Sequence, residues 1–165
     1  MATKGPDQLN DDRVTLVGLV LESAAGLRRE LGRRIEEECG LSLQWFELLL
    51  RLGRSPGCQL RMSDLADQTS LTPSGLTRAI DRLVEAGMVE RMACPEDRRG
   101  AYAKLTDAGL ERIDTAAGVH LRHVDEVLLG ALSPDDQAVL EPILRKIRDQ
   151  VNPGAARTPE PIPPG

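Results

Sequence analysis

Residues 61–109 read RMSDLADQTSLTPSGLTRAIDRLVEAGMVERMACPEDRRGAYAKLTDAG, and the architecture of the chain follows from this segment. Its hydrophobic pattern predicts two short helices followed by a β-hairpin. Ser63 can cap the first helix, on which Leu65 and Ala66 face inward. Residues 70–72 then form a turn. The predicted order is therefore helix, turn, helix and hairpin.

The second helix of this segment has a well-defined start and end. Thr72 can cap it, and Pro73 falls at its first helical position, where the fixed φ suits a helix and the missing N–H needed no partner. Gly87 ends it. The apolar residues follow helical spacing and predict one buried face: Leu76, Ala79, Ile80, Leu83 and Val84. The opposite face is polar: Ser74, Thr77, Arg78, Asp81 and Arg82.

This polar face fits a helix that reads the major groove of DNA. Small hydroxyls and an arginine near a helix N-terminus come closest to base edges and phosphates. Taken alone, the same face also fits an ordinary solvated surface, because amphipathic helices with mixed charge are common. The segment that follows the helix favours the first interpretation.

That segment predicts a β-hairpin. Residues 88–92, MVERM, and residues 101–105, AYAKL, can pair as antiparallel strands. The loop between them carries turn-forming and charged residues: Pro95, Asp97, Arg98, Arg99 and Gly100. Arginine at an exposed hairpin tip can enter a narrow minor groove or bind phosphates. The alternative is that these arginines only pair with Glu96 and Asp97 at the surface, where such pairs contribute little.

These segments resemble the MarR family of winged helix-turn-helix regulators. The resemblance rests on residues 71–91, on the wing at residues 95–109 and on the order of the flanking helices, and it covers roughly residues 13–150. Ala93 and Cys94 depart from the family pattern, which usually has an acidic residue near the start of the wing loop. The resemblance implies a homodimeric repressor that binds double-stranded DNA and is relieved by a small-molecule effector. A twofold dimer presents two reading helices, so its operator would be a pseudo-palindrome.

The candidate DNA contacts are residues of the two short helices and of the wing tip: Ser63, Thr72, Pro73, Ser74, Thr77, Arg78, Arg82, Arg98 and Arg99. Asp81 needs a partner, because an unpaired carboxylate on this face would repel phosphate. It either pairs within its own helix or braces Arg98 or Arg99 and so fixes the wing angle, and Asp97 is a second candidate brace. Trp45 can line a ligand cleft, although an anchor in the core or in the dimer interface is the plainer interpretation.

The composition suits one globular domain, since 41% of the 165 residues are hydrophobic and no long apolar run suggests a membrane span. No secretory signal is recognisable, and Cys39, Cys58 and Cys94 lack metal-ligand spacing, which fits a reducing cytoplasm. The net charge of −5 lies mostly outside the reading module, because residues 61–105 carry seven basic and seven acidic groups. DNA binding would then rest on placed contacts and dimer geometry.

The predicted fold is mainly α-helical with a small β-hairpin wing. The chain divides into three parts: a flexible tail (1–12), a single domain (13–152) and a disordered proline-rich tail (153–165). Within the domain, the winged helix-turn-helix spans about residues 55–109. The helices at 13–39 and 106–152 carry apolar stripes that one small domain does not bury entirely, and the resemblance implies that they form a dimerisation region.

Local signals set the ends of these helices. Gly40 ends the first long helix, and Ser42 can cap the next one. Thr106 can cap the helix after the wing, and Ser133 can cap the last helix. Pro142 lies inside that last helix and removes a backbone hydrogen bond, so a kink or a split is expected just before it.

No catalytic constellation stands out, and neither an enzyme nor a cofactor is expected, because the chain has no Gly-rich phosphate loop and no nucleophile elbow. His120 and His123, followed by Glu126, have a spacing that can hold a metal, but a solvated helix face is the favoured interpretation. Cys94 is the best candidate for a redox-sensing thiol. Two alternatives remain: a redox-sensing or metal-sensing variant of the regulator, and a winged helix that docks a protein instead of DNA.

Overall fold

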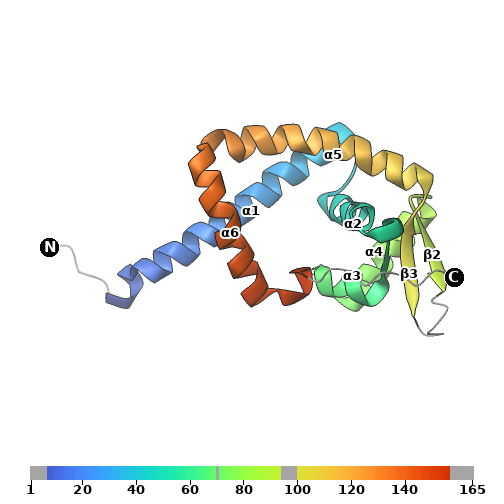
Figure 1. The fold of residues 1–165 in the computed structure, drawn as a ribbon, viewed down its shortest axis with the longest axis horizontal. Helices are drawn as coiled ribbons and strands as arrows, with labels where there is room; N and C mark the ends of the chain where they lie inside the picture. Colours follow the sequence, from blue (N-terminus) through green and yellow to red (C-terminus); the bar gives the residue numbers. More distant parts are fainter. Residues whose placement is uncertain (1–6, 70, 94–99, 157–165) are drawn as a thin grey trace.

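The structure, a computed structural model, describes residues 7–69, 71–93 and 100–156. Helices dominate it (Figure 1). In chain order the elements are η1 (Asp7–Asn10), α1 (Asp12–Cys39), α2 (Leu43–Gly53), η2 (Pro56–Cys58), β1 (Gln59–Arg61), α3 (Met62–Gln68), α4 (Pro73–Glu85), β2 (Val89–Ala93), β3 (Ala101–Leu105), α5 (Asp107–Val127), η3 (Leu129–Ala131), α6 (Pro134–Val151) and η4 (Pro153–Ala156), where η marks a 3-10 helix. The predicted fold class, a winged helix-turn-helix with long helices at both ends, is confirmed.

The three strands form one antiparallel sheet in the order β1-β3-β2. β2 and β3 make the predicted hairpin, in which Val89 lies opposite Leu105. The sequence pattern did not predict β1, whose Leu60 lies opposite Ala103 of β3. A strand of three residues is too short to show a periodic pattern, and β1 exists because β3 provides its partner.

The second helix of the module, α4, starts and ends as predicted. The Thr72 hydroxyl accepts a hydrogen bond from the N–H of Gly75 at 3.1 Å, and Pro73 is the first helical residue. Gly87 has a φ of 71°, a left-handed conformation that favours glycine, and its N–H donates to the carbonyl of Val84 at 2.9 Å. These caps fix the length and the direction of α4.

The start of α3 differs from the prediction. α3 begins at Met62, directly after β1, and Arg61 occupies the N-cap position without a capping side-chain hydrogen bond. The predicted Ser63 cap was therefore wrong. The strand leads the chain straight into the helix, so that Ser63 is already the second helical residue and cannot precede the first turn.

The core lies between α2, the second half of α1 and the winged module. Its largest fully buried side chains include Ile35, Phe46, Leu49, Leu60, Leu65, Leu76, Ile80 and Leu83. The inward face predicted for α4 is buried except at its edge, where Val84 is 37% exposed. Successive residues lie about 100° apart around a helix, and this places Val84 at the edge of the apolar stripe. Its predicted burial was therefore wrong.

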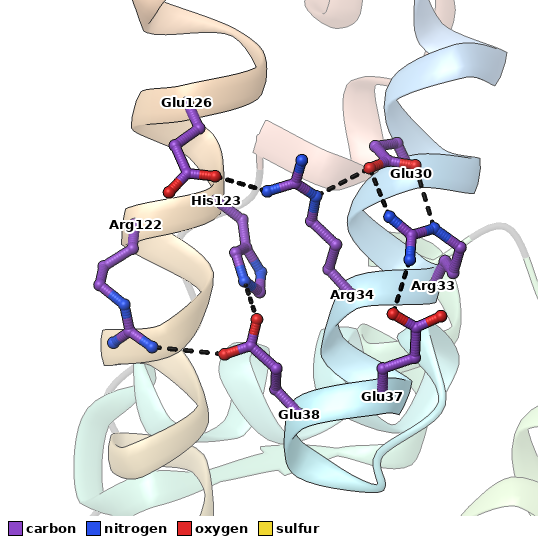
Figure 2. Close-up of polar contacts among 8 residues, drawn as sticks. All are labelled: Glu30, Arg33, Arg34, Glu37, Glu38, Arg122, His123 and Glu126. Carbon is purple, nitrogen blue, oxygen red and sulfur yellow. Dashed lines mark hydrogen bonds and ion pairs between the residues drawn. The ribbon is translucent and has the colours of Figure 1, made fainter.

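Ion pairs join α5 to the second half of α1 (Figure 2). Arg34 of α1 donates to Glu126 of α5 at 2.6 Å and to Glu30 at 2.8 Å. Arg33 and Arg34 both donate to Glu30 and lower the pKa of its carboxyl to about 2. Arg33 also pairs with Glu37 at 2.6 Å. Because these side chains are partly exposed, the network orients the two helices more than it stabilises them.

The first half of α1 projects from the rest of the chain (Figure 1). Large apolar residues are exposed there and along α6: Leu16, Val17, Leu19, Val20, Leu21, Val139, Ile143, Leu144, Ile147 and Val151. None of the residues of α6, all of which the structure describes, is buried. Both terminal helices therefore expose large apolar side chains that the rest of the described chain does not cover.

One prediction about the C-terminal region was wrong, and another was wrong in part. α6 begins with the predicted Ser133 cap and runs unbroken through Pro142, so the helix does not split there, while the alternative expectation of a kink stays a prediction. The proline removes one hydrogen bond to the carbonyl of Ala138, an exposed residue whose carbonyl water can reach, so the helix need not split. The tail was predicted to be disordered from residue 153, whereas Pro153–Ala156 form η4 and pack against α3. Residues 157–165 lie outside the described residues.

Candidate nucleic-acid interface

The candidate interface is the outer face of α4. The caps and the buried stripe turn five polar residues away from the core, and all five are exposed: Ser74, Thr77, Arg78, Asp81 and Arg82. Arg78 and Arg82 form no ion pair or hydrogen bond from their side chains with any residue that the structure describes. Among the described residues, the two arginines therefore present unpaired positive charge on the outer face of α4.

The predicted DNA contacts near the start of α4 are exposed, but two of their hydroxyls already form hydrogen bonds within the chain. Thr72 and Pro73 are exposed, and the Thr72 hydroxyl caps the helix while lying 3.4 Å from that of Ser74. Thr77 is exposed and donates its hydroxyl to the carbonyl of Pro73 at 3.0 Å, which leaves the hydroxyl oxygen able to accept a hydrogen bond. Ser63 on α3 is exposed as well. The residues of α4 in this set lie at the end of the helix that approaches bases most closely in helices of this type.

Asp81 pairs with the wing, although its partner differs from the two arginines that the sequence suggested. Its Oδ1 accepts a hydrogen bond from Arg91 of β2 at 2.8 Å, and Arg91 also donates to the carbonyl of Thr77 at 3.4 Å. Arg91 therefore joins the base of the wing to α4. Sequence reasoning missed it, although the short connection between α4 and β2 was a signal that Arg91 lies close to this helix.

Several predicted wing residues lie outside the described residues: Cys94, Pro95, Glu96, Asp97, Arg98 and Arg99. Ser70 of the turn between the two helices also lies outside them. The predicted tip contacts of Arg98 and Arg99, and the brace assigned to Asp97, stay predictions.

Hydrogen bonds of the Thr106 hydroxyl and a close backbone approach at Gly109 fix the base of the wing to the end of α4. Thr106, the predicted N-cap of α5, donates to the carbonyl of Gly87 at 2.7 Å and accepts from the N–H of Gly109 at 3.0 Å. A Cβ on Gly109 would overlap the carbonyl oxygen of Met88 and lie 2.8 Å from its carbonyl carbon. Only glycine allows this approach, so the direction of the wing relative to α4 is set by the backbone.

The two histidines of α5 do not form the solvated face that was expected. His123 is buried, and its Nε2 lies 2.6 Å from Glu38 of α1, which also accepts from Arg122 (Figure 2). The ring of His120 packs against Phe46, with ring centroids 4.6 Å apart. The expectation failed because apolar contacts with α2 and a cross-helix carboxylate cover this face. Burial and the neighbouring His123 lower the pKa of His120.

The described part of the chain supports neither the metal-sensing nor the redox-sensing alternative. No group of three or more His, Cys, Asp and Glu residues that could hold a metal occurs among residues 7–69, 71–93 and 100–156. Cys39 is buried and Cys58 is half-buried, and both are free thiols. In the same ranges, no helix combines the length and the apolar character needed to cross a membrane.

A cavity of about 530 Å³ opens next to the helix-turn-helix. It is lined by residues of α1, α2, the end of α3 and the C-terminal segment: Arg28, Gln44, Glu47, Leu48, Leu50, Arg51, Arg54, Ser55, Gln68, Thr69, Leu71, Arg148, Asn152 and Ala155. Trp45 is half-buried against the core and does not line this cavity.

The geometry defines the class of protein. Two helices joined by a turn, with an exposed basic face on the second and a hairpin anchored beside it, make a winged helix-turn-helix. In proteins of this type the second helix enters the major groove. A sequence profile of the MarR family matches residues 40–100.

Individual relatives agree with that profile. The chain is 29% identical over 133 residues to YdgJ of Bacillus subtilis, an uncharacterised HTH-type transcriptional regulator, and the match covers 81% of this chain and 79% of YdgJ. It is 34% identical to the multiple antibiotic resistance protein MarR of Escherichia coli, over 51% of this chain and 58% of that protein.

Solved structures show the same fold. Sco3205, a MarR family transcriptional regulator of Streptomyces coelicolor solved in complex with DNA, is 32% identical and superposes with a TM-score of 0.78, over 85% of this chain and 91% of Sco3205. A mutant of Escherichia coli MarR, solved in complex with operator DNA, is 26% identical with a TM-score of 0.72, over 86% of this chain and 99% of that one. The chain therefore belongs to the MarR family of DNA-binding transcriptional regulators.

Proposed function

We propose that this chain is a homodimeric repressor that binds a pseudo-palindromic operator through α4 and the wing and releases it when a small molecule binds. The observation that carries the proposal is the outer face of α4, where Arg78 and Arg82 are exposed and form no ion pair with a described residue. Sco3205 and the Escherichia coli MarR mutant, both with the same fold, were solved bound to DNA. The chain would act in the cytoplasm as a regulator and not as an enzyme.

The terminal helices support the dimer. Leu16, Leu19 and Ile143 are between 45% and 65% exposed, and they belong to an apolar surface that water would otherwise cover. A second copy presenting the same surface is the simplest way to bury it around a twofold axis. Light scattering at micromolar concentration should give twice the 18.0 kDa mass of one chain. A mass of one chain would contradict the dimer.

The wing supplies the second proposed contact. Arg98 and Arg99 would meet phosphates or a minor groove, which carries a degenerate code. Their joint replacement by alanine should weaken binding to cognate and scrambled duplexes alike and flatten the salt dependence. If this variant binds both duplexes like the parent, the wing does not contact DNA.

One titration separates DNA binding from the alternative in which the winged helix docks a protein. The purified protein is mixed with the DNA upstream of its own gene and with a scrambled duplex across a salt series. Phosphate contacts release counterions, so the affinity should fall steeply as salt rises, and the upstream DNA should bind more tightly. Absence of binding to either duplex at low salt would favour the protein-docking function.

The cavity beside the helix-turn-helix supports ligand response. Its volume lies in the range of small-molecule sites. Burial lowers the pKa of the Arg51 guanidinium, whose N–H groups donate to no residue within the described part of the chain. A half-buried cationic donor that has no acceptor among the described residues favours a ligand that carries a negatively charged group. Trp45, which the sequence suggested for such a cleft, belongs to the core side of α2 instead.

A further inference from the structure

The short helix η4, which follows α6 at the C-terminal end of the described chain, holds the helix-turn-helix by a backbone contact. Figure 1 shows α6 descending from the end of α5 and ending beside α3. The N–H of Asn152 donates to the carbonyl of Arg148 at 2.6 Å where α6 ends, and Pro153–Ala156 then pack against α3. We call these four residues the C-terminal strap.

The contact between the strap and α3 requires glycine. A Cβ on Gly154 would overlap the carbonyl oxygen of Asp67 and lie 3.1 Å from its carbonyl carbon. Because these Asp67 atoms belong to the backbone of α3, they cannot move away as a flexible side chain could. Gly154 and Ala155 are half-buried in this contact, although they lie close to the end of the described chain.

α3 is a short helix whose position depends on such contacts. It has seven residues, fewer than an isolated helix needs to persist in water. β1, β3 and the strap are the elements that pack against it most extensively. The strap is the one of these three that connects α3 to a terminal helix, since it continues directly from α6.

We propose that the C-terminal strap is a positioning element that fixes the helix-turn-helix relative to α6, and so sets the distance between the two reading helices of the dimer. The inference rests on the proposed function, in which α6 is held by the partner. Half-sites in an operator lie a fixed helical turn apart, so a reading helix that is already at the right distance loses less conformational freedom on binding. Gly154 would act through α3 and not by touching DNA.

Two variants test the strap. Gly154→Ala adds the obstructing Cβ, and a chain ending at Asn152 removes the strap without adding an atom. Gly118→Ala is the matched control, because a Cβ there meets no atom within 4 Å. Each protein is titrated against the operator and against operators with one base pair added to or removed from the spacer, while light scattering and the melting temperature report the dimer and the fold.

The expected result is that both variants stay dimeric, bind the operator on the order of tenfold more weakly and lose most of the parent's preference for the original spacing. Amide exchange in residues 62–68 should rise without DNA present, and Gly118→Ala should behave as the parent. If Gly154→Ala does not fold, the chain ending at Asn152 decides whether the strap positions the helix-turn-helix.

Three results would overturn the inference. If the truncated chain had the parent's affinity and spacing preference, the strap would position nothing. The proposed function would still stand, because the parent binds the operator. Weaker binding with an unchanged spacing preference would assign the strap a role in stability alone. A parent that binds no duplex would overturn the proposed function and the strap's role with it.

Discussion

Replacing Arg78 with alanine tests the assignment of α4 as the reading helix. Arg78 is the sixth residue of α4, is exposed, and has no ion-pair partner in the described parts of the chain. Its removal therefore breaks no pair with a described residue, and the free energy of unfolding should change by less than about 0.5 kcal/mol. Any larger effect on DNA affinity must come from lost contacts with DNA.

The size of that effect follows from the kind of contact. An arginine bound to a base edge contributes about 1–3 kcal/mol of discrimination, and a twofold dimer loses two such contacts. Arg78→Ala should therefore cost about 2–6 kcal/mol of binding free energy, which corresponds to roughly 30-fold to 20,000-fold in affinity. The loss should be confined to sites that carry the preferred base at one position in each half-site.

Fluorescence anisotropy with the operator and with operators substituted at each position measures this. Arg13→Ala is the control for loss of one positive charge, because the Arg13 side chain is 90% exposed and pairs with Asp11 at the start of α1. If Arg78→Ala weakens every duplex equally and reduces the salt slope, Arg78 binds phosphate and the base-reading role is wrong. If it binds like the Arg13 control, α4 does not face DNA.

Three further predictions rest on single contacts. Asp81→Asn should release Arg91 and raise amide exchange in β2 and β3. It should cost less than about 1 kcal/mol per protomer of DNA-binding free energy, because the Asp81–Arg91 pair is half exposed. Unchanged exchange and affinity would refute the brace. His120→Phe should flatten the fall in melting temperature between about pH 7 and pH 5. The pKa of His120 is lowered in the folded chain, so its contribution to the stability of the fold is present above the unfolded pKa of about 6.5 and is lost as pH falls. A variant whose melting temperature falls with the parent's slope would contradict this. Gly109→Ala should destabilise the fold by about 1–3 kcal/mol through overlap with Met88, whereas Gly118→Ala should not; equal melting temperatures for the two variants would refute the contact.

The sequence predicted the helix ends well because capping chemistry is local. Ser42, Thr72, Thr106 and Ser133 all accept the capping hydrogen bonds expected of them, and Gly40 ends α1 in a left-handed conformation. Each cap needs only neighbours within about four residues, so the signal lies entirely within a short stretch of sequence. The outward face of α4 was predictable for the same reason, since helical spacing alone separates it from the core.

The features that sequence reasoning missed depend on distant partners. β1 needs β3, the burial of His123 needs Glu38 of α1, and the pairing of Asp81 needs the register at which Arg91 enters β2. The strap at Gly154 was missed because proline-rich composition predicts disorder, while the contact is made by backbone atoms that composition does not describe. Such contacts follow from the assembled fold and not from local preference.

A hydroxyl-radical footprint of the protein on the DNA upstream of its gene is the strictest test of a dimer that reads DNA through α4. Two reading helices related by a twofold axis should protect two half-sites about one helical turn, roughly 10 base pairs, apart on one face of the duplex. The half-sites should be related by an inverted repeat. Protection of a single asymmetric half-site, or no protection at protein concentrations at which the dimer forms, would contradict the account.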